Sequence, residues 1–197
     1  MISFLPEIYP DELVYSWFCR YYVHSGCFTQ KMALDDILYS RHNNPSKEFV
    51  GHLSPKAKEK IQSLYSLEEL ALNHTMFPQY ARFLPSKRKK NALHHLAHDF
   101  CDVHQLFAVL PRTESDRFLK YCPECVAEDR KVYGETYWHR VHQIRNMVLC
   151  PIHKCLLEAS SVTAISSQAF TLCSAEDYAV TLQAQPIKNE LLLAYSK

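Results

Sequence analysis

Apolar side chains recur every three or four residues through most of positions 10–110, which is the periodicity of amphipathic helices. A first helix is predicted over residues 10–24, because Pro10 is pre-set for the first helical position. Asp11 and Glu12 would then lie in the first turn, where the helix dipole favours acidic groups. The apolar positions of this segment fall on one face, so the helix is expected to be largely buried.

Residues that can cap a helix divide the rest of this region. Three of them open further predicted helices: Thr29, Ser54 and Ser66. Residues 76–85 contain two prolines and are expected to form an irregular connector. Ser86 then caps the longest predicted helix, which extends to about Phe107. The first part of the chain is therefore predicted to be a helical domain.

The pattern changes after Pro111, where cysteines, histidines and short strand-like segments at 147–149 and 169–172 replace the helical periodicity. The predicted fold is mainly α-helical, with a small module that resembles a zinc ribbon or zinc finger. We predict three parts: a helical domain over residues 1–111, a metal-binding module over 112–158, and the start of a further region over 159–197.

The last part ends in an apolar, helix-like run over residues 187–195 that has no cap. An amphipathic run that stops in this way leads us to expect that the chain is a piece of a longer protein.

The composition excludes several classes of protein. No apolar run approaches the ~18 to 20 residues that cross a bilayer. The N-terminus does not resemble a signal peptide, so a cytoplasmic location is expected. Only three glycines occur, and no two are spaced as in a P-loop or a dinucleotide-binding fingerprint. The formal net charge of +1 neither requires nor excludes a nucleic-acid partner.

Two short pairs of metal-binding residue types carry the clearest chemistry. Cys122 and Cys125 form a Cys-x-x-Cys pair, and Cys150 and His153 form a Cys-x-x-His pair. Two such chelating turns can complete a tetrahedron around one Zn²⁺ ion and leave no position for water, so one structural zinc ion is predicted. The competing interpretations are buried free thiols or a redox pair. Further candidate ligands are Cys155, His139 and His142.

A catalytic zinc site is not expected. The deaminase pattern needs a His-x-Glu sequence before its cysteine pair, and neither His139 nor His142 is followed by the acid. A His-Glu-x-x-His sequence is also absent. We therefore predict a protein that is not an enzyme.

Three segments resemble the TniQ family. The opening Pro-Asp-Glu-Leu-x-Tyr-Ser-Trp over residues 10–17 is similar to the start of that family, and residues 121–140 with 150–154 resemble its zinc segment. Residues 74–80 are similar to a connector of the TnsD branch. The resemblance covers roughly residues 4–158. One departure is Lys154, which stands where the family usually has glycine after Cys-x-x-His.

The resemblance implies a role in choosing the target of a Tn7-like transposition system. TnsD-like members bind double-stranded DNA at a chromosomal attachment site and recruit the AAA+ regulator TnsC. Other members instead deliver TnsC from an RNA-guided CRISPR effector, which is the alternative function. The resemblance also implies a bacterial cytoplasmic protein that associates with the nucleoid when it is bound to DNA.

Clustered cations are the candidates for contact with DNA phosphates. The strongest cluster would lie in the first turn of the longest helix. Cations there oppose the helix dipole, so the stability of the helix does not explain why they are present, whereas contact with phosphates would. The alternative is a solvated helix start. Cations around the predicted zinc module are weaker candidates. The full set is Arg82, Lys87, Arg88, Lys89, Lys90, Arg130, Lys131, Arg140, Arg145 and Lys154.

The first two predicted helices resemble a helix-turn-helix, but Asp35 and Asp36 disfavour entry into a groove lined by phosphates. A packing role or a protein-binding face is favoured instead, and the resemblance makes residues 1–10 with the exposed sides of these helices the preferred surface for TnsC. A row formed by His94, His95 and His98 has the spacing of metal ligands, although an exposed polar stripe is the commoner outcome.

Overall fold

The computed structural model describes residues 2, 4–39, 45–98, 116–164 and 171–179. The predictions for residues 99–115, 169–170 and 187–195 lie outside these ranges. Among the described helices, none combines the length and the apolar character that crossing a bilayer requires.

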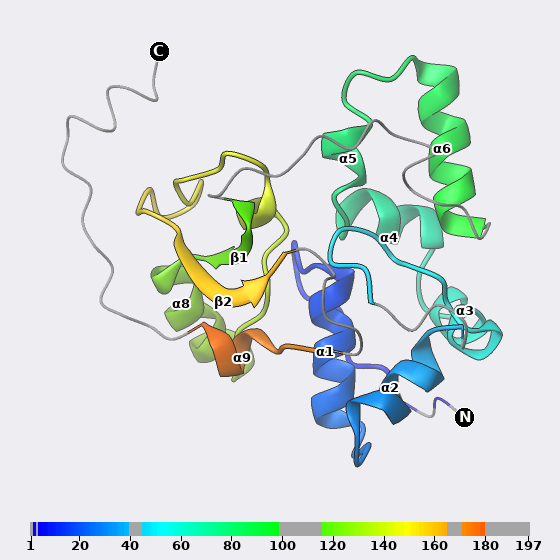
Figure 1. Ribbon diagram of the computed structural model, residues 1–197, viewed down its shortest axis with the longest axis horizontal. Coiled ribbons are helices and arrows are strands. Elements are labelled where there is room, and N and C mark those ends of the chain that lie inside the picture. The colour runs from blue at the N-terminus through cyan, green and yellow to red at the C-terminus, as the bar shows by residue number, and fades with distance from the viewer. Residues whose placement is uncertain (1, 3, 40–44, 99–115, 165–170, 180–197) are drawn as a thin grey trace.

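Helices make up most of the first hundred described residues, as predicted (Figure 1). They are α1 (Val14–His24), α2 (Gln30–Ile37), α3 (Pro55–Gln62), α4 (Leu67–Asn73), α5 (Phe77–Tyr80) and α6 (Ser86–His98). The predicted caps are confirmed for three of them, because the hydroxyls of Thr29, Ser54 and Ser66 each accept a hydrogen bond from the backbone N–H three residues later.

The later part of the chain combines a two-stranded sheet with short helices. Its elements are β1 (Phe118–Tyr121), α8 (Pro123–Tyr133), the 3-10 helix η2 (Val141–Gln143), β2 (Glu158–Thr163) and α9 (Ala175–Tyr178). The two strands are antiparallel, with Tyr121 opposite Glu158. The predicted fold class, mainly helical with a small Cys/His module, is confirmed.

The first helix begins four residues later than predicted, at Val14. Asp11 has a positive φ of 54°, which ends any helical continuation toward Pro10. Its carboxylate instead accepts a hydrogen bond from the backbone N–H of Val141 and pairs with Arg140 at 2.9 Å. Tertiary contacts with residues 116–164, which we call the metal-bearing part after the metal site predicted there, therefore displace the expected helical start.

The strands also differ from the predicted ones. Residues 147–149 form only an isolated bridge, between Leu149 and Leu156, and residues 171–172 are not in a strand. The connector predicted over 76–85 contains the single turn of α5. Strand β1 lacked a clear alternating pattern because its Lys120 is buried, where its ammonium pairs with Asp116 at 3.1 Å.

Helix α1 lies at the centre of the molecule, between the metal-bearing part and the other helices (Figure 1). Its residues from Val14 to Tyr21 are all buried. The main hydrophobic core joins this helix to Leu119, Trp138 and Val162, which come from the later part of the chain. The division at residues 111 and 158 stays a prediction, and the described parts on either side of these boundaries pack together.

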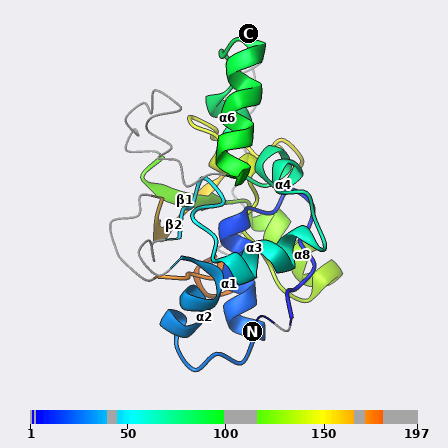
Figure 2. The ribbon, with the colours of Figure 1, turned by 90° about the vertical axis from the view of Figure 1, so that its right-hand side faces the viewer.

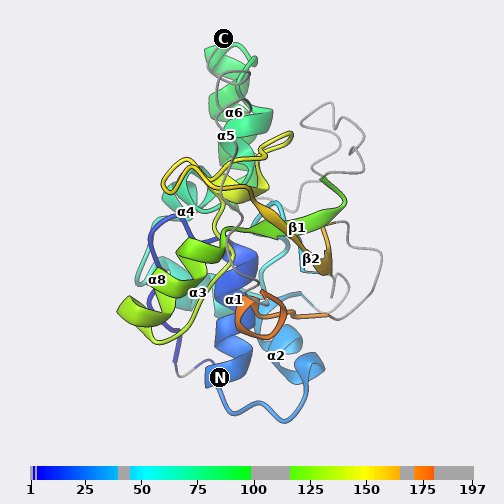
Figure 3. The ribbon, with the colours of Figure 1, turned by 90° about the vertical axis from the view of Figure 1, so that its left-hand side faces the viewer.

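Helix α6 projects from the rest of the molecule (Figures 2 and 3). Of its thirteen residues only Ala92 and Ala97 are buried. A separate, small hydrophobic cluster holds it against α4 and α5 through Phe77, Ala81 and Ala92. We call residues 82–98 the α6 arm, and its outer part, which consists of Arg82, Phe83, Lys87, Arg88, Lys89 and Lys90, the basic tip.

Candidate metal centre

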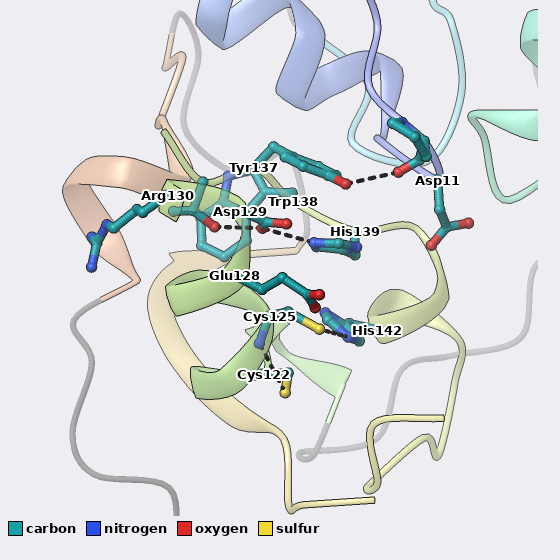
Figure 4. A network of polar contacts seen from close by, with 12 residues as sticks. Asp11, Cys122, Cys125, Glu128, Asp129, Arg130, Tyr137, Trp138, His139 and His142 are labelled. Carbon is teal, nitrogen blue, oxygen red and sulfur yellow. Dashed lines mark hydrogen bonds and ion pairs between the residues drawn. The ribbon is translucent and has the colours of Figure 1, made fainter. Parts of the chain in front are cut away.

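The first chelating turn opens helix α8. Cys122 is the N-cap residue and Pro123 follows at the first helical position, which fixes the backbone without needing an N–H donor. The backbone N–H of Cys125 donates a hydrogen bond to the Cys122 sulfur at 3.4 Å. This geometry turns both sulfur atoms to the same side of the helix start (Figure 4).

The second chelating turn repeats the arrangement without a helix. The backbone N–H of His153 donates to the Cys150 sulfur at 3.4 Å. The turn closes through Lys154, whose N–H donates to the Cys150 carbonyl and whose φ is 58°. This left-handed conformation strongly favours glycine. Lys154, which stands where the family usually has glycine, therefore lies in the turn and is not one of the candidate ligands.

The two turns bring four donor atoms together. The sulfur atoms of Cys122, Cys125 and Cys150 and a ring nitrogen of His153 all lie within 4.8 Å of one another. The Cys125 and Cys150 sulfurs are 3.7 Å apart, and the three sulfurs lie 3.3 to 3.8 Å from His153 Nδ1. Tetrahedral zinc with ordinary bond lengths would space sulfurs about 3.8 Å apart and sulfur from nitrogen about 3.5 Å. The residues therefore fit one tetrahedral ion.

The electrostatics of the cluster also suit a cation. Hydrogen bonds from the Cys122 and Cys125 thiols hold the pKa of Cys150 far below its usual range. Hydrogen bonding with the Cys122 and Cys150 sulfurs, and then burial, raises the pKa of Cys125. A thiolate among buried sulfurs is the form that binds a metal, and a divalent ion would replace the thiol protons.

The other predicted ligands lie around this set. The Cys155 sulfur is 3.2 Å from the Cys122 sulfur but does not belong to the four-atom group. His142 points its Nε2 at the Cys125 sulfur from 3.8 Å, and burial lowers the pKa of this imidazole (Figure 4). His139 pairs instead with Asp129 at 2.9 Å. Cys155 and His142 therefore flank the cluster, and His139 belongs to a neighbouring network.

The structure adds one partner that the sequence pattern did not single out. The Nε2 atom of His153 lies 3.3 Å from a carboxylate oxygen of Glu128, while its Nδ1 faces the sulfurs. Such a carboxylate fixes the orientation of a metal-binding imidazole. Glu128 follows Cys125 by three residues on α8, so helical spacing could have indicated that both lie on one face.

The predicted DNA-contacting cations fall into two groups. The first contains exposed side chains, namely Arg82, Lys87, Arg88, Lys89, Lys90, Lys131 and Lys154. The second contains three arginines that make intramolecular contacts. Arg130 pairs with Glu176 and Arg140 with Asp11, both at 2.9 Å, and Arg145 donates to the Tyr80 hydroxyl at 2.7 Å. The second group holds parts of the fold together.

Comparison with known proteins identifies the family of the chain. A family model described as TniQ matches residues 3–157. The chain belongs to the TniQ family. The transposon Tn7 transposition protein TnsD of Escherichia coli is 32% identical over 155 residues, which is 77% of this chain. The predicted resemblance to a TnsD-type TniQ protein is thus confirmed. This TniQ chain spans only 30% of the length of that relative.

Proposed function

We propose that this TniQ-family chain helps to select the target of a Tn7-like transposition system. It binds double-stranded target DNA and recruits the AAA+ regulator TnsC in the bacterial cytoplasm, where DNA binding associates it with the nucleoid. It catalyses no reaction of its own. The observation that carries this proposal is the TniQ match over residues 3–157, together with the similarity to a transposition protein.

In this proposal one Zn²⁺ ion occupies the Cys/His cluster. Three sulfurs and one imidazole nitrogen are the ligands that zinc prefers in structural sites, and four of them leave no open position. The three cysteines are at most 2% exposed, so neither water nor a substrate has access to them. Bound zinc would therefore join the start of α8 to the turn at residues 150–153 and contribute no chemistry to a reaction.

The basic tip is the proposed phosphate-binding surface. Its five cations are exposed, and four of them occupy the first turn of α6, where free backbone amides add positive potential. The tip projects from the molecule, so duplex DNA can approach it without obstruction from the described residues (Figures 2 and 3). Lys131 and Lys154 are exposed on the metal-bearing part and are further candidates.

A DNA titration tests the proposed binding. Fluorescence anisotropy with a labelled duplex should show an affinity that falls with salt between about 50 and 200 mM, with a logarithmic slope near −0.9 for each neutralised phosphate. Absence of binding at low salt would contradict direct DNA contact. That result would favour the alternative in which the protein serves as an adaptor on an RNA-guided CRISPR effector.

The N-terminal segment and the first two helices form the proposed surface for TnsC. Phe28 is 90% exposed in the turn between α1 and α2, and Phe4 and Met32 are each about half exposed. Unburied apolar side chains of this kind are typical of protein-binding surfaces. Phe28→Ser with Met32→Ser should weaken co-elution with ATP-bound TnsC. The matched control is Val132→Ser with Ile152→Ser. Both of these apolar side chains are 62% exposed, but they lie on the metal-bearing part and not on the proposed TnsC surface.

A further inference from the structure

A second group of metal-binding side chains lies on the α6 arm, away from the Cys/His cluster. Glu68 in the first turn of α4 faces His94 and His98 on α6, and their donor atoms all lie within 4.8 Å of one another. The His94 Nδ1 and the His98 Nε2 are each 3.7 Å from the same Glu68 oxygen. The two imidazole rings are 4.7 Å apart, between centroids.

The contacts between the carboxylate and the two rings are longer than hydrogen bonds. Both 3.7 Å separations exceed the usual 2.7 to 3.2 Å, and they are ion pairs only when the imidazoles are protonated. A tetrahedral zinc ion with bonds of about 2.0 to 2.2 Å would hold such donors about 3.4 Å apart. A movement of a few tenths of an ångström would bring the Glu68 oxygen to that distance from each ring nitrogen, and the exposed side chains can rotate to do so.

The helices hold the three residues in place before any ion arrives. His94 and His98 are four residues apart and therefore share one face of α6. Helices α4 and α6 pack together through the small cluster that includes Leu72, Ala92 and Leu96. The Ser66 cap fixes the first turn of α4, from which Glu68 projects.

We propose that Glu68, His94 and His98 form a second, solvent-accessible site for a divalent transition-metal ion of the zinc class. Two imidazoles and one carboxylate suit zinc, and three protein ligands leave a position for water. The donors are 34 to 63% exposed, in contrast to the buried sulfurs, so this ion exchanges readily. Bound metal ties α6 to α4 and restrains the arm that carries the basic tip. The site itself does not depend on the proposed function.

The test is a zinc count on the tag-free full chain. With excess zinc the wild type should hold two equivalents, of which a moderate chelator removes one quickly. His94→Ala, His98→Ala and Glu68→Gln should each hold only the slowly released equivalent. His95→Ala is the matched control, because His95 is exposed on the same helix outside the group, and it should still hold two.

Cobalt spectra and amide exchange provide independent readouts. The second equivalent of Co²⁺ should add no thiolate charge-transfer absorption, because its ligands contain no sulfur. Zinc at the second equivalent should also slow hydrogen exchange along α6 in the wild type but not in His94→Ala. A wild type that binds one equivalent, or a His94→Ala variant that retains both, would overturn the proposal. Loss of the second equivalent in His95→Ala would overturn this choice of ligands.

Discussion

Helix α8, which carries two residues of the Cys/His cluster, and the α6 arm lie on different sides of α1 (Figure 1), and the two regions are held in different ways. The sulfurs of the cluster are almost fully buried, and their donors come from two turns 25 residues apart, as between Cys125 and Cys150. The α6 arm buries two alanines and keeps its charged side chains in solvent. With the proposed zinc ion bound, ligand bonds hold the cluster together, whereas a small apolar contact holds the arm.

The difference indicates how the protein can combine a rigid part with an accessible one. Around the two chelating turns the buried cluster consists of four cysteines and Leu157, so metal bonds would there replace an apolar core, since a small core alone supplies only a few kcal/mol. The α6 arm would have to reach DNA, so its cations need to be exposed to solvent, and little apolar surface remains to hold the arm against the rest of the protein. We therefore expect removal of the metal to unfold the region around the cluster, and removal of charge from the basic tip to weaken DNA binding without affecting that region.

Loss of the cluster should have the largest effect. Cys150→Ser removes a proposed zinc ligand, and metal binding of this kind supplies ~10 kcal/mol or more of apparent folding free energy. We expect loss of the tightly bound zinc and loss of amide protection over β1, α8 and β2, as measured by elemental analysis and hydrogen exchange. A metal-free protein that remains fully protected there would refute the structural role.

Two neighbouring variants test which atoms are ligands. His153→Ala should release the zinc, because its Nδ1 completes the four-atom group. Cys155→Ser should keep one equivalent, because its sulfur lies 3.2 Å from that of Cys122 but outside the four-atom group. The reverse outcome would make Cys155 the fourth ligand in place of His153.

Arg20 joins α1 to the metal-bearing part, and its removal should cost the next largest amount. Its guanidinium pairs with buried Glu12 at 2.9 Å and with Glu135 at 2.8 Å. Arg20→Met leaves Glu12 buried without its partner, which costs about 3 to 5 kcal/mol. Urea denaturation should show this loss, and His24→Met provides the control, since His24 pairs with the same Glu135 from an exposed position. An Arg20→Met loss no larger than that of the control would argue against a stabilising pair.

Glu12 also makes stability depend on pH. Burial raises the pKa of Glu12 to about 7, against 4.5 in an unfolded chain, and the charge of Arg20 only partly opposes this. The folded state then binds more protons than the unfolded state between these values, so stability falls as pH rises. Relative to Glu12→Gln, the wild type should lose about 2 to 3 kcal/mol between about pH 5 and pH 8. A difference that is constant with pH would show that Glu12 is ionised throughout.

The local signals in the sequence predicted much of the fold. Thr29, Ser54 and Ser66 cap helices as predicted, because an N-cap depends on residues within one turn. The same locality explains why the two chelating turns could be recognised from their spacing. Each pair needs only its own four residues to bring two donors to one side, and the structure brings both pairs together.

The remaining features depend on contacts between distant residues. Asp11 and Glu12 were predicted to lie in the first turn of a helix. Instead, Asp11 accepts a hydrogen bond from a backbone N–H 130 residues later, and Glu12 pairs with Arg20. Strand β1 was missed because the ammonium of its buried Lys120 donates hydrogen bonds to the carbonyls of Ile144 and Met147, which lie more than 20 residues away in the sequence. The group formed by Glu68, His94 and His98 likewise depends on the packing of α4 on α6, and only the histidine row could be recognised from local spacing.

Neutralising the basic tip should affect DNA binding and leave the metal-bearing part unchanged. Replacing Lys87, Arg88, Lys89 and Lys90 with glutamine should weaken binding on the order of ten- to hundredfold, about equally for all sequences. The salt slope should decrease by about 0.9 for each lost phosphate contact. Helix stability should not fall, because the lost cations opposed the dipole. Lys56→Gln with Lys60→Gln on α3 is the control, and equal weakening there would mean that no particular surface binds DNA.

Lys154→Gly should give the smallest effect, and it should be stabilising. Lys154 has a φ of 58° in the turn between the cluster and β2, a conformation that costs a non-glycine residue about 1 to 2 kcal/mol. Glycine removes that cost but gains freedom in the unfolded chain, so the net gain should be about 0.5 to 1 kcal/mol by thermal unfolding of the zinc-loaded protein. Asn146→Gly is the matched control, since Asn146 has a φ of 59° but asparagine tolerates this region better, and it should gain less. Destabilisation by Lys154→Gly would mean that the lysine side chain, and not the backbone of the turn, stabilises this part of the metal centre.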